Sequence, residues 1–258
     1  MLLPVGDDNS DRVITPYVNY LLIAINIFIF IFFQWGGVNI AFTHAFSTVP
    51  AEILTGKDIV TSGEIFTDYA TGYTYELPGL QPTPVPVYFT LITSMFMHGG
   101  WAHLAGNMLY LWIFGDNIEN RIGHFRYLVF YLLCGVLASL SHVFATVIQA
   151  QNSLIPSLGA SGAISGVLGA YLLLYPGRKV HAIVFVFVIS IPAVLALGIW
   201  IAFQVVSGLG LLGGEESGGV AYAAHIGGFV AGFILIKMFD PVKQAVRSSP
   251  FIERRRIR

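Results

Sequence analysis

A glycine- and serine-rich stretch, SLGASGAISGVLG at 157–169, contains the residue best suited to nucleophilic chemistry. Ser161 has little side-chain bulk around it and leads into an apolar run, so another backbone can approach its hydroxyl closely. A serine hydroxyl becomes a nucleophile when an adjacent base takes its proton. The stretch also has a structural interpretation, because Gly162 and Gly166 have the small-xxx-small spacing that packs membrane helices together. On this stretch alone, the packing interpretation is favoured.

Four further polar side chains lie in apolar surroundings. The segment MHGGWAHLAGN contains His98, His103 and Asn107, and the segment AYAAHIGGFVAG contains His225. His103 and Asn107 are four residues apart, so both face one side of a helix. His225 can take the Ser161 proton and return it to a leaving amine. Asn107, a histidine of the first segment and the Ser161 amide can then stabilise the oxyanion.

Each of these residues also has a structural interpretation. A lone histidine in a membrane helix often bonds a neighbouring carbonyl, and an asparagine often holds two helices together. Ionisable groups in hydrocarbon are costly, so several of them at one depth favour a functional site. A metal site built on His98, His103 and His225 is the main rival, but it lacks a carboxylate and leaves Ser161 without a task. We therefore expect neither a metal ion nor a cofactor.

The composition indicates a membrane protein. Of the 258 residues, 55% are hydrophobic and only 10% are charged, and the mean hydropathy is +0.74. This surface cannot be that of a soluble domain. The net charge of −1 gives no reason to expect a nucleic-acid partner. The single cysteine, Cys134, excludes an intrachain disulfide.

Hydrophobic runs predict an all-α polytopic membrane protein. Six spans are expected, at about 17–33, 101–119, 125–149, 161–175, 181–206 and 220–239. Residues 1–16 are expected to form a short polar tail. The connection at 35–88 is too polar to cross the bilayer and is expected to fold in short amphipathic pieces at the membrane surface. The whole chain, 1–258, is expected to be a single membrane domain.

The basic residues predict the orientation. Twelve of the thirteen fall on one side of the six-span scheme: Arg12, Arg121, Arg126, Arg178, Lys179, Lys237, Lys243, Arg247, Arg254, Arg255, Arg256 and Arg258. Only Lys57 falls on the other side. The positive-inside rule then makes both termini cytoplasmic, with the 240–258 tail basic and the 35–88 loop outside the cytoplasm.

Helix lengths place the polar residues at one depth. Asn107 and His225 each lie about five residues inside their spans, or about 8 Å below the outer boundary. The fourth span has about 15 residues, rises only about 22 Å, and cannot cross a core of about 30 Å. If Arg178 and Lys179 hold its inner end at the cytoplasmic surface, Ser161 starts about 8 Å down. A helix that begins at this depth must line a cavity or be buried in protein.

Three motifs in this order resemble the rhomboid family of intramembrane serine proteases. They are MHGGWAHLAGNM, GASGAISG and AHIGGFVAG, and the resemblance covers about 97–239. It implies a Ser-His dyad without an aspartate, with Ser161 as nucleophile and His225 as base. It implies an oxyanion hole made by His103, Asn107 and the Ser161 amide.

The resemblance also implies supporting residues. His98, Gly159 and Gly162 lie beside the dyad, and Gly228 and Gly232 form the family's GxxxG, which brings the sixth span against the fourth. Glu119 resembles a structural acid of the family, and we expect Arg121 or Arg126 to be its partner.

The chain departs from the family pattern at two places. The first loop has no Trp-Arg pair, so its fold is not predicted. Ser165 stands where some members place an aromatic ring that stacks on the catalytic histidine, which leaves open what orients His225. Ser165 is itself a second candidate nucleophile, but it lies one turn deeper than Ser161.

The function expected from the residues and the resemblance is intramembrane serine endopeptidase activity. Its partners would be single-span membrane proteins and the lipid bilayer, and its location the cell membrane. The 208–219 loop, with its many glycines, is expected to cap the site. The alternatives are a non-catalytic relative that binds membrane helices, the histidine metal site, and a transporter, which the lack of an internal repeat disfavours.

Overall fold

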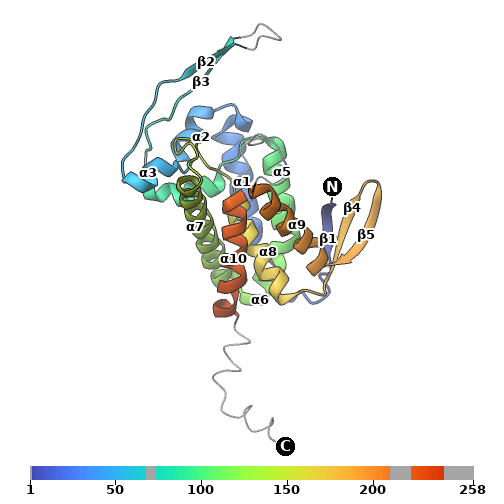
Figure 1. Cartoon of the computed structure of the whole chain (residues 1–258). Coiled ribbons are helices and arrows are strands. Elements are labelled where there is room, and N and C mark those ends of the chain that lie inside the picture. The colour runs from blue at the N-terminus through green and yellow to red at the C-terminus, as the bar shows by residue number, and fades with distance from the viewer. Residues whose placement is uncertain (1, 68–73, 210–221, 241–258) are drawn as a thin grey trace, which may run out of the picture.

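The structure is a computed structural model that describes residues 2–67, 74–209 and 222–240 (Figure 1). The predicted cap at 208–219 and the tail after Asp240 lie almost wholly outside these residues. Most of the described chain is helical, and two small sheets accompany the helices. The helical segments are α1 (Tyr17–Phe32), η1 (Trp35–Gly37), α2 (Ile40–Phe46), α3 (Pro50–Thr55), η2 (Val87–Phe89), α4 (Thr90–Thr93), η3 (Ser94–Phe96), α5 (Trp101–Tyr110), the π-helical η4 (Leu111–Gly115), α6 (Asp116–Ile122), α7 (His124–Ile148), α8 (Ser161–Leu174), α9 (Ala193–Gly208) and α10 (Tyr222–Phe239).

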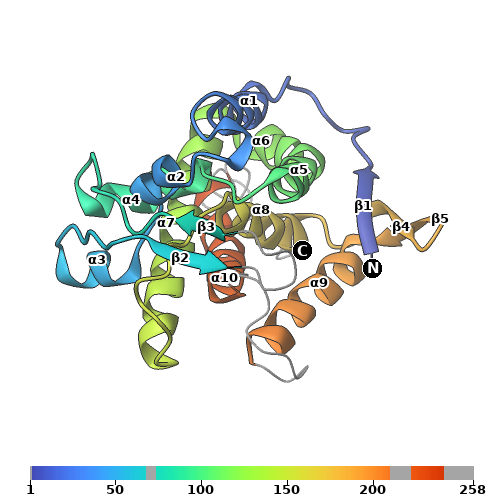
Figure 2. The same ribbon diagram turned by 90° about the horizontal axis from the view of Figure 1, so that it is seen from above.

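Helix α8 lies at the centre of the helical bundle. Ten consecutive residues of α8, from Gly162 to Tyr171, are buried, as expected for a helix that is apolar on every side. Figure 2, seen from above, shows α7 and α10 beside α8, with α1, α5 and α6 on one side of it and α9 at the edge of the bundle. The bundle therefore surrounds the helix that begins at Ser161.

Glycines set the distance between α8 and α10. A Cβ atom added at Gly228 would lie 2.1 Å from the carbonyl oxygen of Gly162. A Cβ atom added at Gly232 would lie 1.9 Å from the carbonyl oxygen of Gly166. Neither contact is possible for a real carbon atom, so the two backbones can lie this close only because Gly228 and Gly232 carry no side chain. Gly162 and Gly166 mainly make room for α7, because their Cβ atoms would lie 2.7 Å from Ala138 Cβ and 2.4 Å from Cys134 Cβ.

Two of the expected spans coincide with helices that can cross a bilayer by length and composition. Among the described residues these are α7 and α10, while α1, α8 and α9 are shorter apolar helices. The second expected span corresponds to α5, η4 and α6 in succession. The first residues of the sixth expected span lie outside the described residues.

The expected polar tail and the start of the fifth span are corrected by the structure. Residues Leu2–Asp7 form strand β1, which pairs antiparallel with β4 (Lys179–Val184), and β4 pairs with β5 (Phe187–Pro192). A continuous apolar run such as 182–189 is compatible with a strand or a helix, and its Val, Ile and Phe residues favour a strand. Pro192 then precedes the first turn of α9, where its missing N–H costs nothing.

Buried polar contacts hold β1 against the bundle. The Asp7 carboxylate accepts hydrogen bonds from Asn117 of α6, at 2.9 Å, and from the hydroxyl of Tyr171 of α8. Burial raises the pKa of Asp7 from 3.8 to about 6, with a smaller contribution from the nearby charge of Asp116. The first residues of the chain are thus a structured part of the fold.

Glu119 acts as a brace, but with other partners than expected. Its carboxylate accepts the backbone N–H groups of Val18 (2.9 Å) and Asn19 (2.7 Å), at the start of α1, and contacts His124. A carboxylate is favourable at a helix N-terminus because free N–H groups point outward there. The expected partner Arg121 instead donates two bonds to Asp240, at 3.1 and 3.0 Å.

The connection after α1 contains the short helices that the sequence predicts and one hairpin that it does not. Helices α2 and α3 are followed by the two-stranded sheet of β2 (Glu64–Thr67) and β3 (Thr74–Leu77). Figure 1 shows this hairpin extending away from the helices. Between α2 and α3, the connection is joined to the segment that leads into α8, because Thr48 exchanges two backbone hydrogen bonds with Ser157 (2.9 and 2.8 Å), four residues before Ser161.

Candidate active site

Ser161 and His225 are joined by a hydrogen bond. Ser161 is the first residue of α8, and His225 lies in the first turn of α10. The distance between Ser161 Oγ and His225 Nε2 is 2.8 Å. Both side chains are only half-buried. This is the separation that a hydroxyl needs to pass its proton to an imidazole.

The chain reaches Ser161 through a glycine with a positive φ angle. Gly159 has a φ of +119°, and its N–H donates to the Ser94 carbonyl at 2.8 Å. A Cβ atom at this position would lie 2.8 Å from both Cε1 and Nε2 of His103 and 3.7 Å from Ser161 Oγ. Gly159 therefore serves two purposes, since it permits the backbone conformation and leaves room for His103 beside the serine.

The ring of His103 has a defined tautomer. Its Nδ1 accepts the N–H of Gly99 at 3.3 Å, so in the neutral ring the proton is on Nε2. Nε2 and Cε1 are the ring atoms nearest to the position that a Gly159 Cβ would take, and that position is itself 3.7 Å from Ser161 Oγ. His103 thus presents a hydrogen-bond donor beside the serine hydroxyl.

Asn107 and His98 carry buried polar atoms that no described residue satisfies. These atoms are Nδ2 of Asn107 and both ring nitrogens of His98. The backbone of His98 is fixed by Gln34, which donates to its carbonyl at 2.8 Å and accepts its N–H at 3.0 Å. The rings of His98 and His103 are 5.1 Å apart. Unpaired buried donors are expensive, and a ligand oxygen would satisfy them.

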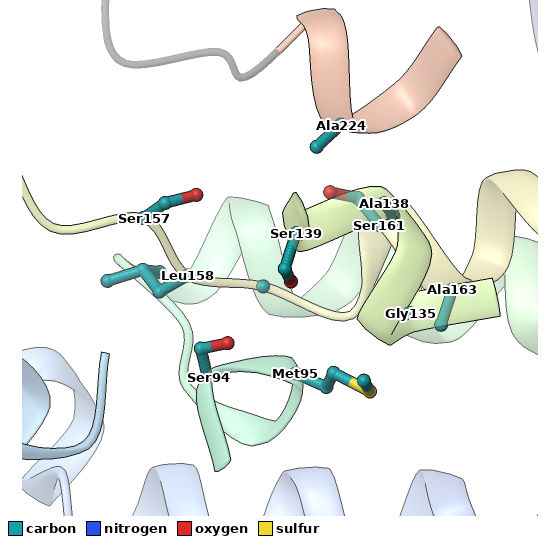
Figure 3. Close-up of a pocket in the computed structure, with 12 residues that line it drawn as sticks. Ser94, Met95, Gly135, Ala138, Ser139, Ser157, Leu158, Ser161, Ala163 and Ala224 are labelled. Atoms are coloured by element: carbon teal, nitrogen blue, oxygen red, sulfur yellow. The ribbon is translucent and has the colours of Figure 1, made fainter. Parts of the chain in front are cut away.

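A cavity of about 20 Å³ adjoins the serine (Figure 3). Its lining includes Ser94, Ser139, Ser157 and Ser161, together with Ala224 of α10. This volume is sufficient for about one water molecule, and hydroxyl groups are suitable partners for it.

The second nitrogen of His225 contacts a residue that the sequence did not single out. Gln204 of α9 lies with its Oε1 2.7 Å from His225 Nδ1. The indole of Trp200, one turn earlier in α9, lies 6.0 Å from the imidazole with an interplanar angle of 37°. The sequence signal for Gln204 was a single amide side chain in a mostly apolar helix. Its partner could not be predicted, because only the tertiary structure shows which residue it faces.

Ser165 and the histidine metal site are the two rivals for this region. The Ser165 hydroxyl donates to the Ser161 carbonyl at 2.6 Å, and its side chain is buried. Across the described residues, no three His, Cys, Asp or Glu side chains are grouped to hold a metal ion. The geometry therefore favours Ser161 over both.

Apolar helices that bring a serine and a histidine into contact define a helical membrane protein with a hydroxyl-imidazole site. A family model, the rhomboid domain, matches residues 86–240, more than half of the chain. The chain belongs to the rhomboid family.

Several named relatives are similar to this chain over the same region. Rhomboid protein 1, mitochondrial, of Saccharomyces cerevisiae is 33% identical over 156 residues, which cover 60% of this chain and 43% of the relative. The rhomboid protease GluP of Bacillus subtilis is 37% identical over 139 residues, covering 53% and 26%. The presenilin-associated rhomboid-like protein A, mitochondrial, of Danio rerio is 37% identical over 143 residues, covering 55% and 35%. The matched region is thus about a quarter to less than half the length of these relatives.

Proposed function

We propose that this protein is an intramembrane serine endopeptidase. Its substrates are single-span membrane proteins, cleaved in or near their transmembrane segments. The observation that carries the proposal is the 2.8 Å contact between Ser161 Oγ and His225 Nε2. The name of one relative, rhomboid protease GluP, supports the same class of activity.

The first half of the reaction forms an acyl-enzyme. His225 Nε2 takes the hydroxyl proton as Ser161 Oγ attacks the substrate carbonyl carbon. The imidazolium then gives this proton to the departing amine, and the peptide bond breaks. Because an intact helix hydrogen-bonds its own carbonyl groups, the substrate must unwind locally first, so small or helix-breaking residues are expected near the cleaved bond.

The oxyanion is stabilised by donors that are already in position. The Asn107 Nδ2, the His103 Nε2–H and the backbone N–H of Ser161 are the three donors of the proposed hole. The lack of a partner for Asn107 Nδ2 supports this assignment, because an idle buried donor is otherwise a net cost. Donors held in place before the reaction need no reorganisation during it. His98 supports His103 through its ring contact.

The second half of the reaction consumes water. The cavity beside Ser161, lined by three further serine hydroxyls, is suited to hold the attacking molecule. His225 takes one proton from that water as its oxygen attacks the acyl carbon. The bond between the acyl carbon and Ser161 Oγ then breaks, the imidazolium returns the proton to Oγ, and the new carboxyl group leaves. No cofactor or metal ion takes part in this scheme.

The proposed setting is the cell membrane, with six spans, both termini cytoplasmic, and the 35–88 loop outside the cytoplasm. Twelve basic residues on one side of this scheme support the orientation. In this frame α8 begins below the outer surface, where a short helix is acceptable because it is enclosed by protein. The whole chain forms one membrane domain.

Cleavage of a single-span model substrate by the purified protein in detergent tests the proposal. Wild type should release two fragments, and Ser161→Ala and His225→Ala should each release none. Ser165→Ala is the matched control, since it removes a hydroxyl one turn away that bonds only its own helix. Activity in Ser161→Ala, or binding of the substrate without cleavage by wild type, would refute the enzyme and favour a helix-binding relative.

A further inference from the structure

We propose that Gln204 is a positioning residue for His225, acting where a third member of a catalytic triad would act. The inference deepens the proposed protease mechanism and rests on it. It follows from the 2.7 Å contact between Gln204 Oε1 and His225 Nδ1, opposite the 2.8 Å contact of Nε2 with Ser161.

The contact selects one imidazole tautomer. An amide oxygen can only accept a hydrogen bond, so its neighbour Nδ1 must carry the ring proton. In a neutral imidazole this leaves the lone pair on Nε2, the atom that faces the Ser161 hydroxyl. The opposite tautomer would present an N–H to Ser161 and could not accept its proton. Gln204 thus keeps His225 in the form that can act as a base.

The contact also fixes the ring in space. Gln204 is 6% exposed, so water competes little with His225 for the amide oxygen. Trp200 stands four residues earlier in α9, on the same helix face, and its indole lies beside the same imidazole. The two side chains from α9 together restrict the ring where Ser165 provides no aromatic surface.

A neutral amide suits this environment better than a carboxylate does. Burying an ionised acid among apolar helices carries a large desolvation cost, whereas an amide that makes its hydrogen bond carries little. The amide gives up part of the charge stabilisation that an acid would offer the imidazolium. The other titratable groups that interact electrostatically with His225 are His103 of α5 and His142 of α7. Both residues are kept in the variants at position 204, so they do not account for a difference between those variants.

Both restraining contacts come from α9, which packs against α10 and α8 and which Figure 2 shows at the edge of the bundle. The base is therefore correctly oriented only while α9 occupies this position. A displacement of α9 would leave Ser161 and His225 on their own helices and remove the tautomer preference.

Two variants of similar side-chain length separate positioning from packing. Gln204→Met keeps the length and removes the acceptor, and Gln204→Glu keeps an acceptor at the same place. Leu197→Met, at another buried position of α9, is the matched control. In the cleavage assay, Gln204→Met should lower kcat roughly 10- to 100-fold with KM changed less than about twofold. Leu197→Met should behave as wild type.

The pH profile gives the signature that a packing defect cannot produce. Gln204→Glu should recover most of the activity, and the acid limb of its kcat/KM profile should move to higher pH, since a carboxylate favours the imidazolium. Wild-type kcat in Gln204→Met would overturn the inference. So would equal losses in both variants without a shifted profile.

A nuclear magnetic resonance measurement tests the inference without using proteolysis. Nitrogen-15 labelling of the seven histidines, with His225 assigned by comparison with His225→Ala, reports which ring nitrogen carries the proton. Wild type should show His225 protonated on Nδ1, and Gln204→Met should shift toward the Nε2–H form. A wild-type His225 protonated on Nε2 would overturn the inference even if the protein cleaves. A protein that shows the expected tautomer but never cleaves would instead contradict the proposed function alone.

Discussion

Replacing Gly232 with alanine should move α10 away from α8 and separate the dyad. A Cβ atom at Gly232 lies 1.9 Å from the Gly166 carbonyl oxygen and 2.4 Å from its carbonyl carbon, both rigid backbone atoms. Carbon and oxygen atoms approach no closer than about 3.3 Å without strain, so the backbones must separate locally by about 1.4 Å. A shift of this size carried to His225 would lengthen the 2.8 Å contact with Ser161 beyond hydrogen-bond range.

The expected effect of Gly232→Ala is a fall in kcat of about 100-fold, the usual consequence of misplacing a catalytic group by about 1 Å. The thermal unfolding midpoint in detergent should also fall, because overpacking costs about 1–3 kcal/mol. Gly228→Ala, with its Cβ 2.1 Å from the Gly162 oxygen, should behave alike. Gly198→Ala in α9 is the matched control, since its Cβ meets nothing within 4 Å. Near wild-type kcat in Gly232→Ala would refute the claim that this glycine contact holds the dyad together.

Three further predictions follow from the structure. Asn107→Leu should lower kcat by about 10²- to 10³-fold, because it removes a donor of the oxyanion hole. It should not lower the thermal unfolding midpoint, because Asn107 Nδ2 has no hydrogen-bond partner in the free protein, and a destabilised variant would contradict this. Gly159→Ala should reduce activity through both its φ of +119° and the approach to His103, which a cleavage assay of the folded variant checks. Burial in the folded state raises the pKa of Asp7 from 3.8 to about 6, so between pH 3.8 and about 6 the folded state binds a proton that the unfolded state does not. The protonated Asp7 therefore contributes its full stability below pH 3.8, and this contribution is lost as the pH rises through about 6. The unfolding midpoint of wild type should therefore fall relative to Asp7→Asn over this window, and parallel curves would contradict the assignment.

Helix positions were largely predictable from the sequence. The apolar run at 125–149 differs from α7 by one residue at each end, and the run at 161–175 differs from α8 by one residue at its C-terminal end. The common depth of Ser161 and His225 in the bilayer was inferred from helix lengths and stays a prediction, while the structure has the two side chains in contact. The helix predictions succeed because periodicity and length report on one helix at a time.

Features that depend on distant pairing were not predictable. The run at 182–189 is apolar without a break, so its hydrophobic pattern did not separate a strand hairpin from the start of a helix, and nothing in it indicated that Leu2–Asp7 joins as a third strand. Glu119 was recognisable as a brace, but its partners are backbone N–H groups about a hundred residues away. Gln204 faces His225 only because of where α9 stands, and no spacing in the sequence reports that placement.

Active-site labelling measures most directly whether Ser161 is an activated nucleophile. A fluorophosphonate probe, followed by mass spectrometry of the labelled peptide, locates any reactive serine in the purified protein. The account predicts modification of Ser161 alone in wild type and its loss in His225→Ala, because the proton acceptor is then missing. Modification of Ser165, or equal labelling of Ser161 with and without His225, would contradict the account.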